Sequence, residues 1–503
     1  MLEKAFTIVM KKDKVIIIGA GFSGLAAASV LAKDGFDVTV LEKNSTPGGR
    51  ARKFSENGFT FDMGPSWYWM PDVFEKFFAL FNKRVEDFYQ LERLDPSYRF
   101  YFGKGDIVDV PATFKDVIDI FEKEEAGAGA ALSKFLVEAE YKYKIAMSKF
   151  VYKPGLSMFE FAQPEMLASV FRLDMFSSFE KHLKQYFKSP RLRQMLEFPI
   201  LFLGGTAKNT PALYSLMNYG DIKLGTWYPV GGMYSVVEGM VELAASLGVK
   251  FIYNSPVEKL EVKQGKISAV IAAGERHEAP YILATADYEH VEQSLLPDEY
   301  KSYSKKYWDS RVLSPSSLIF FLGIDKKLEG IEHHTLFFDQ DLGKHSEAIY
   351  ENPGWPENPS LYFSCTSKTD SSVAPEGMEN LFVLIPVAPG LEDTEATREK
   401  YFQIILERFK HLTGQDISKN IVFKRSYAHA DFESDYNAYK GNAYGLANTL
   451  LQTAFLKPKM RSKKVKNLFY AGQLTAPGPG VPPALISGEM AARLILKESK
   501  SSN

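Results

Sequence analysis

The stretch KVIIIGAGFSGLAAASVLAKDGFDVTVLEK, residues 14–43, decides the fold because it combines a strand, a tight turn, a helix and a second strand. Residues 15–18 form a short, wholly apolar run, which is typical of a strand buried on both faces of a parallel sheet. The turn carries the spacing GxGxxG, which lets the backbone approach a pyrophosphate and lets the helix pack closely on the strand. The stretch therefore predicts an α/β unit that binds a dinucleotide.

The acid at the end of the second strand strengthens this prediction. Glu42 follows the strand residues 38–41 and is placed to bind the ribose hydroxyls of adenosine, which disfavours a 2′-phosphate. A glycine-rich turn without a ligand is the alternative, but it explains neither Glu42 nor the small side chains at residues 26–28 of the helix. The residues predicted from spacing to serve the nucleotide are Gly19, Gly21, Gly24 and Glu42.

The composition of the chain limits the classes of protein to which it can belong. Its 503 residues suggest roughly three domains. A net charge of −2 provides no global attraction to nucleic acid, and no nucleic-acid partner is expected. Cys365 is the only cysteine, which excludes an internal disulfide and a cysteine-based metal cluster, so no metal site is expected. Since no uninterrupted apolar run reaches about 18 residues, we expect no transmembrane helix.

Two further motifs extend the nucleotide-binding pattern to both ends of the chain. PGGRA at residues 47–51 brings two glycine amides and the permanently charged Arg50 toward the cofactor, with a surface salt bridge as the alternative role of this arginine. At the other end, YAGQLTAPGPGVPPALISG, residues 470–488, combines a strand end, a rigid loop and a helix N-terminus. Such a loop can lay backbone amides against a flavin ring or a pyrophosphate. One cofactor domain is therefore expected to form from distant segments.

Together with FDMGPS at 61–66, FPILFLGG at 198–205, TWYPVGGM at 226–233 and HHTLFF at 333–338, these motifs resemble the bacterial carotenoid desaturases, flavoproteins of the phytoene desaturase and hydroxycarotenoid 3,4-desaturase type. The resemblance covers nearly the whole chain and implies FAD as the cofactor. Gln473 stands where many flavoproteins have Asp. The residues that the resemblance adds to the predicted cofactor site are Ala20, Phe22, Ser23, Lys43, Gly48, Gly49, Arg50, Ala51, Gly64, Pro65, Ser66, Val257, Gly472, Gln473, Gly480, Val481 and Pro482.

The resemblance also implies how the chain is divided. The expected fold class is α/β, with a Rossmann-like FAD-binding domain of the amine oxidase and phytoene desaturase type, interleaved with a mixed-sheet substrate domain and a helical insertion. Residues 10–110, 211–299 and 456–503 are expected to form the discontinuous FAD-binding domain. Residues 111–210 are expected to form a helical insertion for membrane or substrate contact, and residues 300–455 the substrate-binding domain.

The activity implied by the resemblance is that of an FAD-dependent oxidoreductase. It introduces double bonds into a C40 carotenoid by hydride transfer to flavin, with phytoene as the expected substrate. The principal alternative is a 3,4-desaturase acting on a 1′-hydroxylated carotenoid late in the pathway. A redox-neutral carotene isomerase, a non-catalytic isoprenoid carrier and an amine oxidase are further alternatives, although the intact PGGRA and PGPGVP motifs argue against a carrier. Quinone or oxygen is the expected electron acceptor, and the oligomeric state stays open.

Contact with a membrane is expected from the physical properties of such a substrate. A C40 hydrocarbon dissolves in the bilayer, and its passage through water would cost roughly tens of kcal/mol at about 0.8 kcal/mol for each CH₂. The enzyme is therefore expected in the cytoplasm, peripherally bound to the inner face of the cell membrane. The candidate docking segment is residues 155–193, with a buried helix lining the substrate cavity as the alternative. Its apolar and basic side chains are Leu167, Val170, Phe171, Phe176, Phe179, Lys181, Lys184, Lys188, Arg191 and Arg193.

Neither the aromatic nor the titratable residues identify a catalytic group. Trp-Tyr-Trp at 67–69 either lines the entrance for a long polyene or packs in the core beneath the flavin, since both arrangements use the same side chains. His333 and His334 form the most noticeable titratable pair, and a structural role is expected for them. Asp62 is expected to order the loop that follows it through hydrogen bonds. Because delocalisation stabilises the cation left by hydride loss, a strong protein base is unnecessary, and no catalytic residue is assigned.

Overall fold

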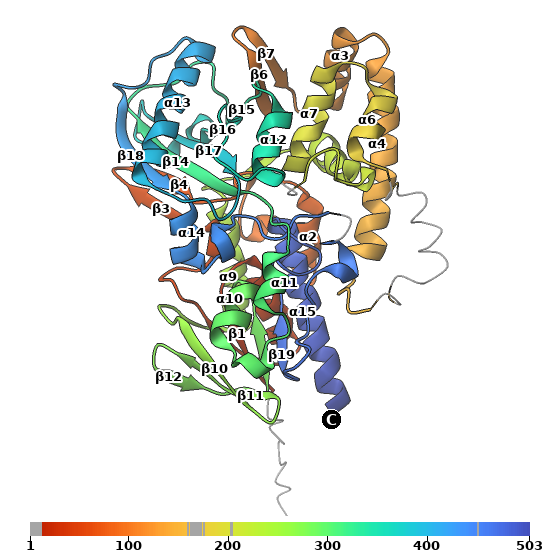
Figure 1. Ribbon diagram of the computed structural model, residues 1–503, viewed down its shortest axis with the longest axis vertical. Helices are drawn as coiled ribbons and strands as arrows, with labels where there is room; N and C mark the ends of the chain where they lie inside the picture. Colours follow the sequence, from red (N-terminus) through yellow and green to blue (C-terminus); the bar gives the residue numbers. More distant parts are fainter. Residues whose placement is uncertain are drawn as a thin grey trace, which may run out of the picture.

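The computed structural model describes residues 13–157, 160, 174, 177–201, 205–449 and 452–502, and these residues form three structural parts. In Figure 1 a parallel sheet with its helices lies at the bottom, a larger mixed sheet lies above it on the left, and a group of helices lies above it on the right. Red, green and blue segments meet in the lower part, which is therefore assembled from the beginning, the middle and the end of the chain. The predicted α/β class is confirmed.

The parallel sheet holds five strands in the order β19-β13-β1-β2-β9, and every neighbouring pair runs parallel. The central strand β1 is buried from Val15 to Ile18, as its apolar run predicts. Because parallel neighbours need crossover connections, the chain leaves the sheet and returns to it from distant segments. The bounds are β1 (Lys14–Ile18), β2 (Asp37–Leu41), β9 (Lys250–Ile252), β13 (Tyr281–Ala284) and β19 (Leu468–Tyr470).

Helices α1 (Phe22–Lys33) and α15 (Val481–Ser502) pack against this sheet, and α9 (Tyr234–Ser246) packs against α1. Close packing depends on glycine at two points. A Cβ atom at Gly24 would lie well inside contact distance of the Gly19 carbonyl oxygen. A Cβ atom at Gly488 would likewise meet the carbonyl oxygen of Ser23, where α15 crosses α1. The spacing GxGxxG therefore serves helix packing here, as expected.

The mixed sheet holds seven strands in the order β18-β14-β17-β16-β15-β6-β7. Side chains alternate along β14, so that Phe320 packs on Phe402 of α13, whereas Phe321 packs on Phe54 and Phe61 of the β3–β4 hairpin. Both faces of the strand are therefore buried. The bounds are β3 (Lys53–Glu56), β4 (Phe59–Asp62), β6 (Tyr98–Gly103), β7 (Asp106–Val110), β14 (Ser316–Ile324), β15 (His334–Phe337), β16 (Leu361–Ser364), β17 (Glu379–Val387), β18 (Ile421–Tyr427) and α13 (Glu395–Thr413).

Two strands from the first 110 residues pair with the mixed sheet. β6 pairs with β15 and β7 pairs with β6, although residues 10–110 are all predicted to belong to the FAD-binding domain. The apolar residues of β6 complete that sheet beside β15, and Phe100 packs on Phe338 after β15 and on Phe198 of the helical part. The partner strand β15 lies more than 200 positions later in the sequence. The local sequence of β6 therefore gives no sign of this pairing.

The helical part contains α3 (Phe114–Glu124), α4 (Ala128–Ile145), α6 (Phe179–Tyr186) and α7 (Pro190–Leu201). Within the described part of the chain, no helix is long and apolar enough to cross a membrane. The smaller elements are α2 (Pro71–Ala79), β5 (Leu91–Arg93), β8 (Trp227–Pro229), β10 (Val257–Lys263), β11 (Lys266–Ala272), β12 (Glu275–His277), α10 (Tyr288–His290), α11 (Lys305–Asp309), α12 (Leu342–Tyr350) and α14 (His429–Tyr436).

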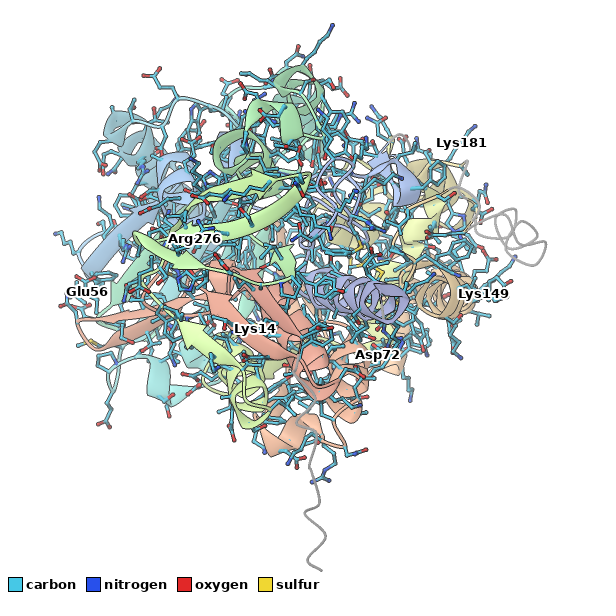
Figure 2. The ribbon with its side chains drawn as sticks, turned by 90° about the horizontal axis from the view of Figure 1, so that it is seen from below. Lys14, Glu56, Asp72, Lys149, Lys181 and Arg276 are labelled. Carbon is cyan, nitrogen blue, oxygen red and sulfur yellow. The ribbon has the colours of Figure 1, made fainter. Side chains whose placement is uncertain are left out.

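The candidate docking segment is described only in part, since Leu167, Val170, Phe171 and Phe176 lie outside the described residues. Phe179 begins α6 and is fully buried, so its ring belongs to the core of the helical part. Lys181 and Lys184 on the same helix are exposed. In Figure 2, Lys181 and Lys149 lie toward the same edge of the molecule. The docking role of this segment stays a prediction.

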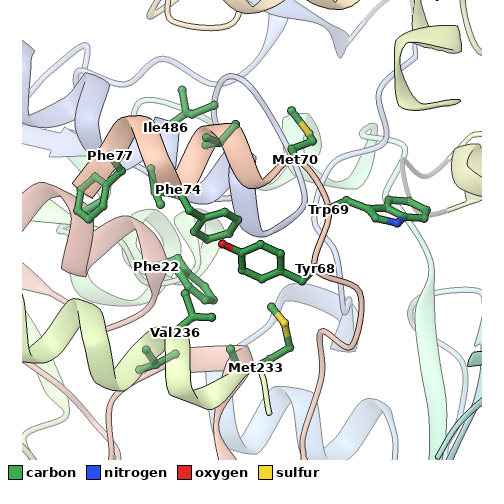
Figure 3. Packing of buried hydrophobic residues seen from close by; sticks show 14 of the residues in the cluster. Phe22, Tyr68, Trp69, Met70, Phe74, Phe77, Met233, Val236 and Ile486 are labelled. Carbon is green, nitrogen blue, oxygen red and sulfur yellow. The ribbon is translucent and has the colours of Figure 1, made fainter. Parts of the chain in front are cut away.

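The aromatic stretch at residues 67–69 contributes mainly to the core. Tyr68 is 1% exposed and stacks on Phe74 of α2, with ring centroids 4.6 Å apart. Its hydroxyl shares a hydrogen bond of 2.9 Å with that of Tyr89. Figure 3 shows Tyr68 facing Phe74 and Phe22, while Trp69 points to the other side of the chain. Of the two predicted roles for this stretch, core packing is the one that Tyr68 fulfils.

Candidate cofactor site

A cavity of about 290 Å³ lies where the parallel sheet meets the mixed sheet. Most of the residues predicted for the cofactor line it, although they come from both ends and the middle of the chain. Ala20, Gly24, Ser66 and Pro482 were predicted as well but lie outside its lining. The predicted residues that line the cavity are Gly19, Gly21, Phe22, Ser23, Glu42, Lys43, Gly48, Gly49, Arg50, Ala51, Gly64, Pro65, Val257, Gly472, Gln473, Gly480 and Val481.

Glycines keep open the part of the cavity that faces the N-terminus of α1. Gly19 has φ +104°, a conformation that other residues adopt only at a cost, and it turns the chain from β1 into the helix. A Cβ atom at Gly21 would meet no protein atom within 4 Å, because it would point into open space. A Cβ atom at Gly49 would lie 3.4 Å from Cα of Gly21, so the PGGRA motif and the phosphate loop face each other closely. Backbone amides at a helix N-terminus suit a phosphate group.

Glu42 lies at the end of β2 with its carboxylate held in place. It is 5% exposed, and Oε2 accepts a hydrogen bond from the amide of Ala20 at 2.8 Å. Oε1 accepts one from the amide of Asn44, also at 2.8 Å. Each carboxylate oxygen can accept a further hydrogen bond, so the group remains able to bind a ribose hydroxyl.

Arg50 connects the PGGRA motif with the C-terminal motif. Its Nη2 donates to the carbonyl oxygen of Asn442 at 3.1 Å. In the amide orientation that satisfies both ends of its side chain, Gln473 accepts from Arg50 Nη2 at 2.9 Å and donates to the Tyr444 carbonyl at 3.2 Å. The neutral side chain of Gln473, the residue after Gly472, thus binds the guanidinium of Arg50. Burial lowers the pKa of Arg50, while the nearby Asp287 carboxylate raises it.

These features show that the residues present fit a dinucleotide with a planar ring. Arg50 Nε is buried and has no hydrogen-bond partner among the described residues, so the guanidinium keeps a donor for a ligand. Ile319 of β14 and Leu384 of β17 supply an apolar wall from the mixed sheet. Glycine amides for phosphates, an acid for a ribose and an apolar wall for a ring therefore surround one cavity.

A further group of residues lines the same cavity but was not predicted from the sequence. They belong to the mixed sheet and to the segment that follows β18, and neither part carries a nucleotide motif. Only the three-dimensional structure identifies these residues, since several residue types could line the cavity at each of these positions. They include Ser317, Ile319, Leu384, Phe432, Asp435, Tyr436, Asn437, Ala443 and Tyr444.

The two adjacent histidines are buried and hydrogen-bonded to neighbouring side chains. His334 stacks on Trp67 at 4.0 Å and its Nδ1 shares a hydrogen bond of 2.8 Å with the hydroxyl of Tyr362. His333 Nδ1 shares one of 2.7 Å with Thr369. Burial lowers the pKa of His333 to about 3 and that of His334 well below its ordinary value. Both rings are therefore neutral and weakly basic near pH 7, and neither lines the cavity.

Asp62 caps a helix, which differs from its predicted role in the loop that follows it. Its carboxylate accepts from the amides of Met233 and Tyr234 at 2.7 and 3.1 Å, at the start of α9. Gly232 at φ +93° leaves room for this contact, because a Cβ atom there would lie 2.6 Å from Oδ2. Burial raises the pKa of Asp62 to about 7, against the effect of the two amides. The carboxylate thereby ties FDMGPS to TWYPVGGM, two motifs far apart in sequence.

Comparison with known proteins agrees with this geometry. The family described as flavin-containing amine oxidoreductase matches residues 22–496. The chain belongs to this family. It is an oxidoreductase, and FAD is its cofactor.

Two relatives are similar over almost the whole chain. The carotenoid 3,4-desaturase of Haloarcula japonica is 42% identical over 487 residues, which cover 97% of this chain and 98% of that protein. The zeta-carotene-forming phytoene desaturase of Myxococcus xanthus is 31% identical over 490 residues, which cover 96% and 94%. Within the flavoprotein family, the chain is thus a member of the carotenoid desaturases.

A solved structure supports the fold alone. An oxidoreductase from Methanosarcina mazei superposes with a TM-score of 0.62, covering 96% of this chain and 100% of the other, at 16% sequence identity. The predicted flavoprotein fold is therefore confirmed.

Proposed function

We propose that this carotenoid desaturase introduces double bonds into a C40 carotenoid, with phytoene as its substrate. The observation that carries the proposal is the similarity, over 96–97% of the chain, to relatives named as desaturases of carotenoids. A phytoene-desaturating protein is among these relatives. The apolar wall formed by Ile319 and Leu384 supports a hydrocarbon substrate beside the cofactor.

The cofactor site that we propose follows from where the predicted residues lie. Gly21, Gly49 and Arg50 hold the pyrophosphate, since Gly21 leaves space for it, Gly49 lies beside Gly21, and the guanidinium supplies charge. Glu42 binds the adenosine ribose and Val257 contacts the adenine. The flavin ring lies along the C-terminal part of the site, at Gly472, Gln473, Gly480 and Val481.

The reaction needs little chemistry from the protein beyond positioning and dryness. FAD, when bound, supplies the acceptor for the hydride. The chain contributes an apolar surface that excludes water and holds the substrate at the ring. His333 and His334 take no proton in this scheme, because burial keeps their pKa far below neutral. Transfer of a proton from the adjacent carbon to a weak base neutralises the allylic cation and extends the conjugation, so a strong protein base is unnecessary.

A second candidate is the 3,4-desaturation of a hydroxylated carotenoid. It is favoured by the higher identity to the 3,4-desaturase of Haloarcula japonica, 42% against 31% for the phytoene desaturase of Myxococcus xanthus. For either substrate we propose peripheral docking on a membrane, supported by the insolubility of carotenoids in water. Quinone or oxygen is the proposed electron acceptor.

The test is a pigment profile from bacteria that accumulate phytoene, with and without the gene. The control carries Gly21→Val, which is expected to remove FAD. Coloured products with longer conjugation, absent from the control, would establish a phytoene desaturase. Phytoene left unchanged by a soluble, flavin-loaded protein would refute that substrate. Strains that make 1′-hydroxylated carotenoids would then test the second candidate, and a product of unchanged conjugation length would indicate an isomerase.

A further inference from the structure

One wall of the cofactor cavity is supplied by α14 and the residue that follows it. Phe432, Asp435, Tyr436 and Asn437 all line the cavity. The helix contacts β14 and β18, so the mixed sheet determines where it lies. This wall therefore belongs to residues 300–455, which are predicted to serve the substrate, and it lines the proposed cofactor cavity.

Lys43 and its neighbour bind the C-terminal end of α14. The Lys43 ammonium group donates to the carbonyl oxygen of Ser434 and, at 3.3 Å, to Oδ1 of Asn437. The side-chain amide of Asn44 donates to the carbonyl oxygen of Asp435 at 3.4 Å. The last carbonyl groups of a helix carry partial negative charge, which favours a cation at this position.

A second set of contacts joins α14 to residues 50–52. Arg52 forms an ion pair of 2.5 Å with Asp435, and the two side chains are 13% and 30% exposed. The Asp435 carboxylate also accepts from the Tyr427 hydroxyl at 2.9 Å. The guanidinium carbons of Arg50 and Arg52 lie 5.2 and 5.3 Å from the centre of the Tyr436 ring. Such cation–π contacts fix the planes of both guanidinium groups.

These contacts connect two walls of one cavity. Lys43 and Arg50 line it from the nucleotide fold, and Asp435 and Tyr436 line it from α14. A dinucleotide in the cavity therefore lies between the parts that the contacts hold together. We propose that α14 and residues 43–52 form a latch on bound FAD, which slows the release of the cofactor.

The latch is weak enough to open. It consists of a few polar contacts at half-buried side chains, whereas α1 and α15 are joined by close backbone packing at Gly488. Single contacts of the first kind are individually weak and can break without unfolding of the domain. Lys43, Arg52, Asp435 and Tyr436 are thus positioning residues, since they act through the walls of the cavity.

The inference rests on the proposed placement of FAD in this cavity, and its test uses flavin release. FAD-loaded protein is diluted rapidly, and the rise in free-flavin fluorescence gives the release rate. Asp435→Asn and Tyr436→Leu are each expected to speed release about tenfold. Lys43→Met is expected to speed it about threefold. The matched control is Lys410→Met, which breaks the exposed pair with Asp416 at the end of α13 and is expected to leave the rate unchanged.

Two comparisons keep the test decisive. Tyr436→Phe keeps the ring beside both arginines and is expected to restore slow release, which a general loss of stability would not do. If Tyr436→Leu fails to fold, the isosteric Asp435→Asn still decides. Release rates within about twofold of the parent in Asp435→Asn and Lys43→Met would overturn the latch. Parent protein that binds no FAD would overturn both the latch and the proposed position of FAD in the cavity. Flavin-loaded protein that leaves phytoene unchanged would refute only the proposed substrate.

Discussion

The phosphate loop at residues 19–24 and the wall formed by α14 line the same cavity, yet only the loop could be recognised in the sequence. The loop works through its backbone, so it requires glycine at fixed spacing, as the contact between Gly24 and the Gly19 carbonyl shows. The wall works through side chains that the mixed sheet carries into place. A site that depends on backbone approach leaves a pattern in the sequence, whereas a wall supplied by tertiary packing leaves none.

The largest effect is expected where the loop faces empty space. Gly21→Val would place its side chain in the cavity, where no protein atom lies within 4 Å of the new Cβ. Gly21 has φ −78°, which valine can adopt, so the fold is expected to persist. FAD affinity is expected to fall about 100-fold or more, because the pyrophosphate can no longer approach the backbone. Flavin content and the dissociation constant for added FAD measure this.

A matched control separates loss of the ligand from loss of the fold. Gly103→Val, at the end of β6, also points into open space, with its nearest neighbour 3.9 Å away, but lies outside the cavity. It is expected to leave FAD binding unchanged. Normal FAD affinity in a folded Gly21→Val variant would contradict the placement of the pyrophosphate.

Substitution of Gly24, three residues later in the same loop, is expected to lower the stability of the fold itself. Gly24→Ala would drive a methyl group into the Gly19 carbonyl, with the Thr285 hydroxyl 3.0 Å away on the other side. Overpacking of this kind costs about 1–3 kcal/mol of unfolding free energy. The urea midpoint of the apoprotein is expected to fall accordingly. An unchanged midpoint would show that α1 can shift away from β1, which would weaken the argument for close packing.

The sequence predicted the features that local patterns specify, but not those that depend on contacts between distant segments. β1, α1, β2 and β19 were predicted because local patterns specify them, and Gly472 lines the same cavity as the first motif. The membership of β6 in the mixed sheet was missed, since its partner β15 lies far away in sequence. Asp62 was assigned to its own loop because the amides that it caps, at Met233 and Tyr234, become neighbours only in the fold.

A pH dependence is expected from a buried lysine beside the C-terminal loop. Lys457 Nζ has no hydrogen-bond partner among the described residues, and it lies 3.2 Å from the point where a Cβ atom of Gly478 would be. Burial lowers the pKa of Lys457 to about 7, against 10.5 for the free group. Between these two values the folded protein binds fewer protons than the unfolded chain, so this group makes stability rise with pH.

Lys457→Met removes that contribution. The variant is expected to be more stable than the parent at pH 7, by a few kcal/mol at most, and the gain is expected to shrink as the pH approaches 10.5. Urea unfolding of both proteins at pH 7 and pH 10 provides the comparison. Stability curves that run parallel across this range would contradict the lowered pKa. A gain seen in apoprotein but not in FAD-loaded protein would indicate that the charge interacts favourably with the cofactor.

The smallest expected effect concerns the aromatic stretch that could have served either the core or a substrate entrance. Tyr68→Phe keeps the ring stacked on Phe74 and removes only the hydrogen bond to the Tyr89 hydroxyl. Because this leaves one buried hydroxyl without its partner, the unfolding free energy is expected to fall by about 1 kcal/mol. FAD affinity and the carotenoid product pattern are expected to stay the same, since Tyr68 does not line the cavity. A changed product pattern at unchanged stability would instead assign this ring to the path of the polyene.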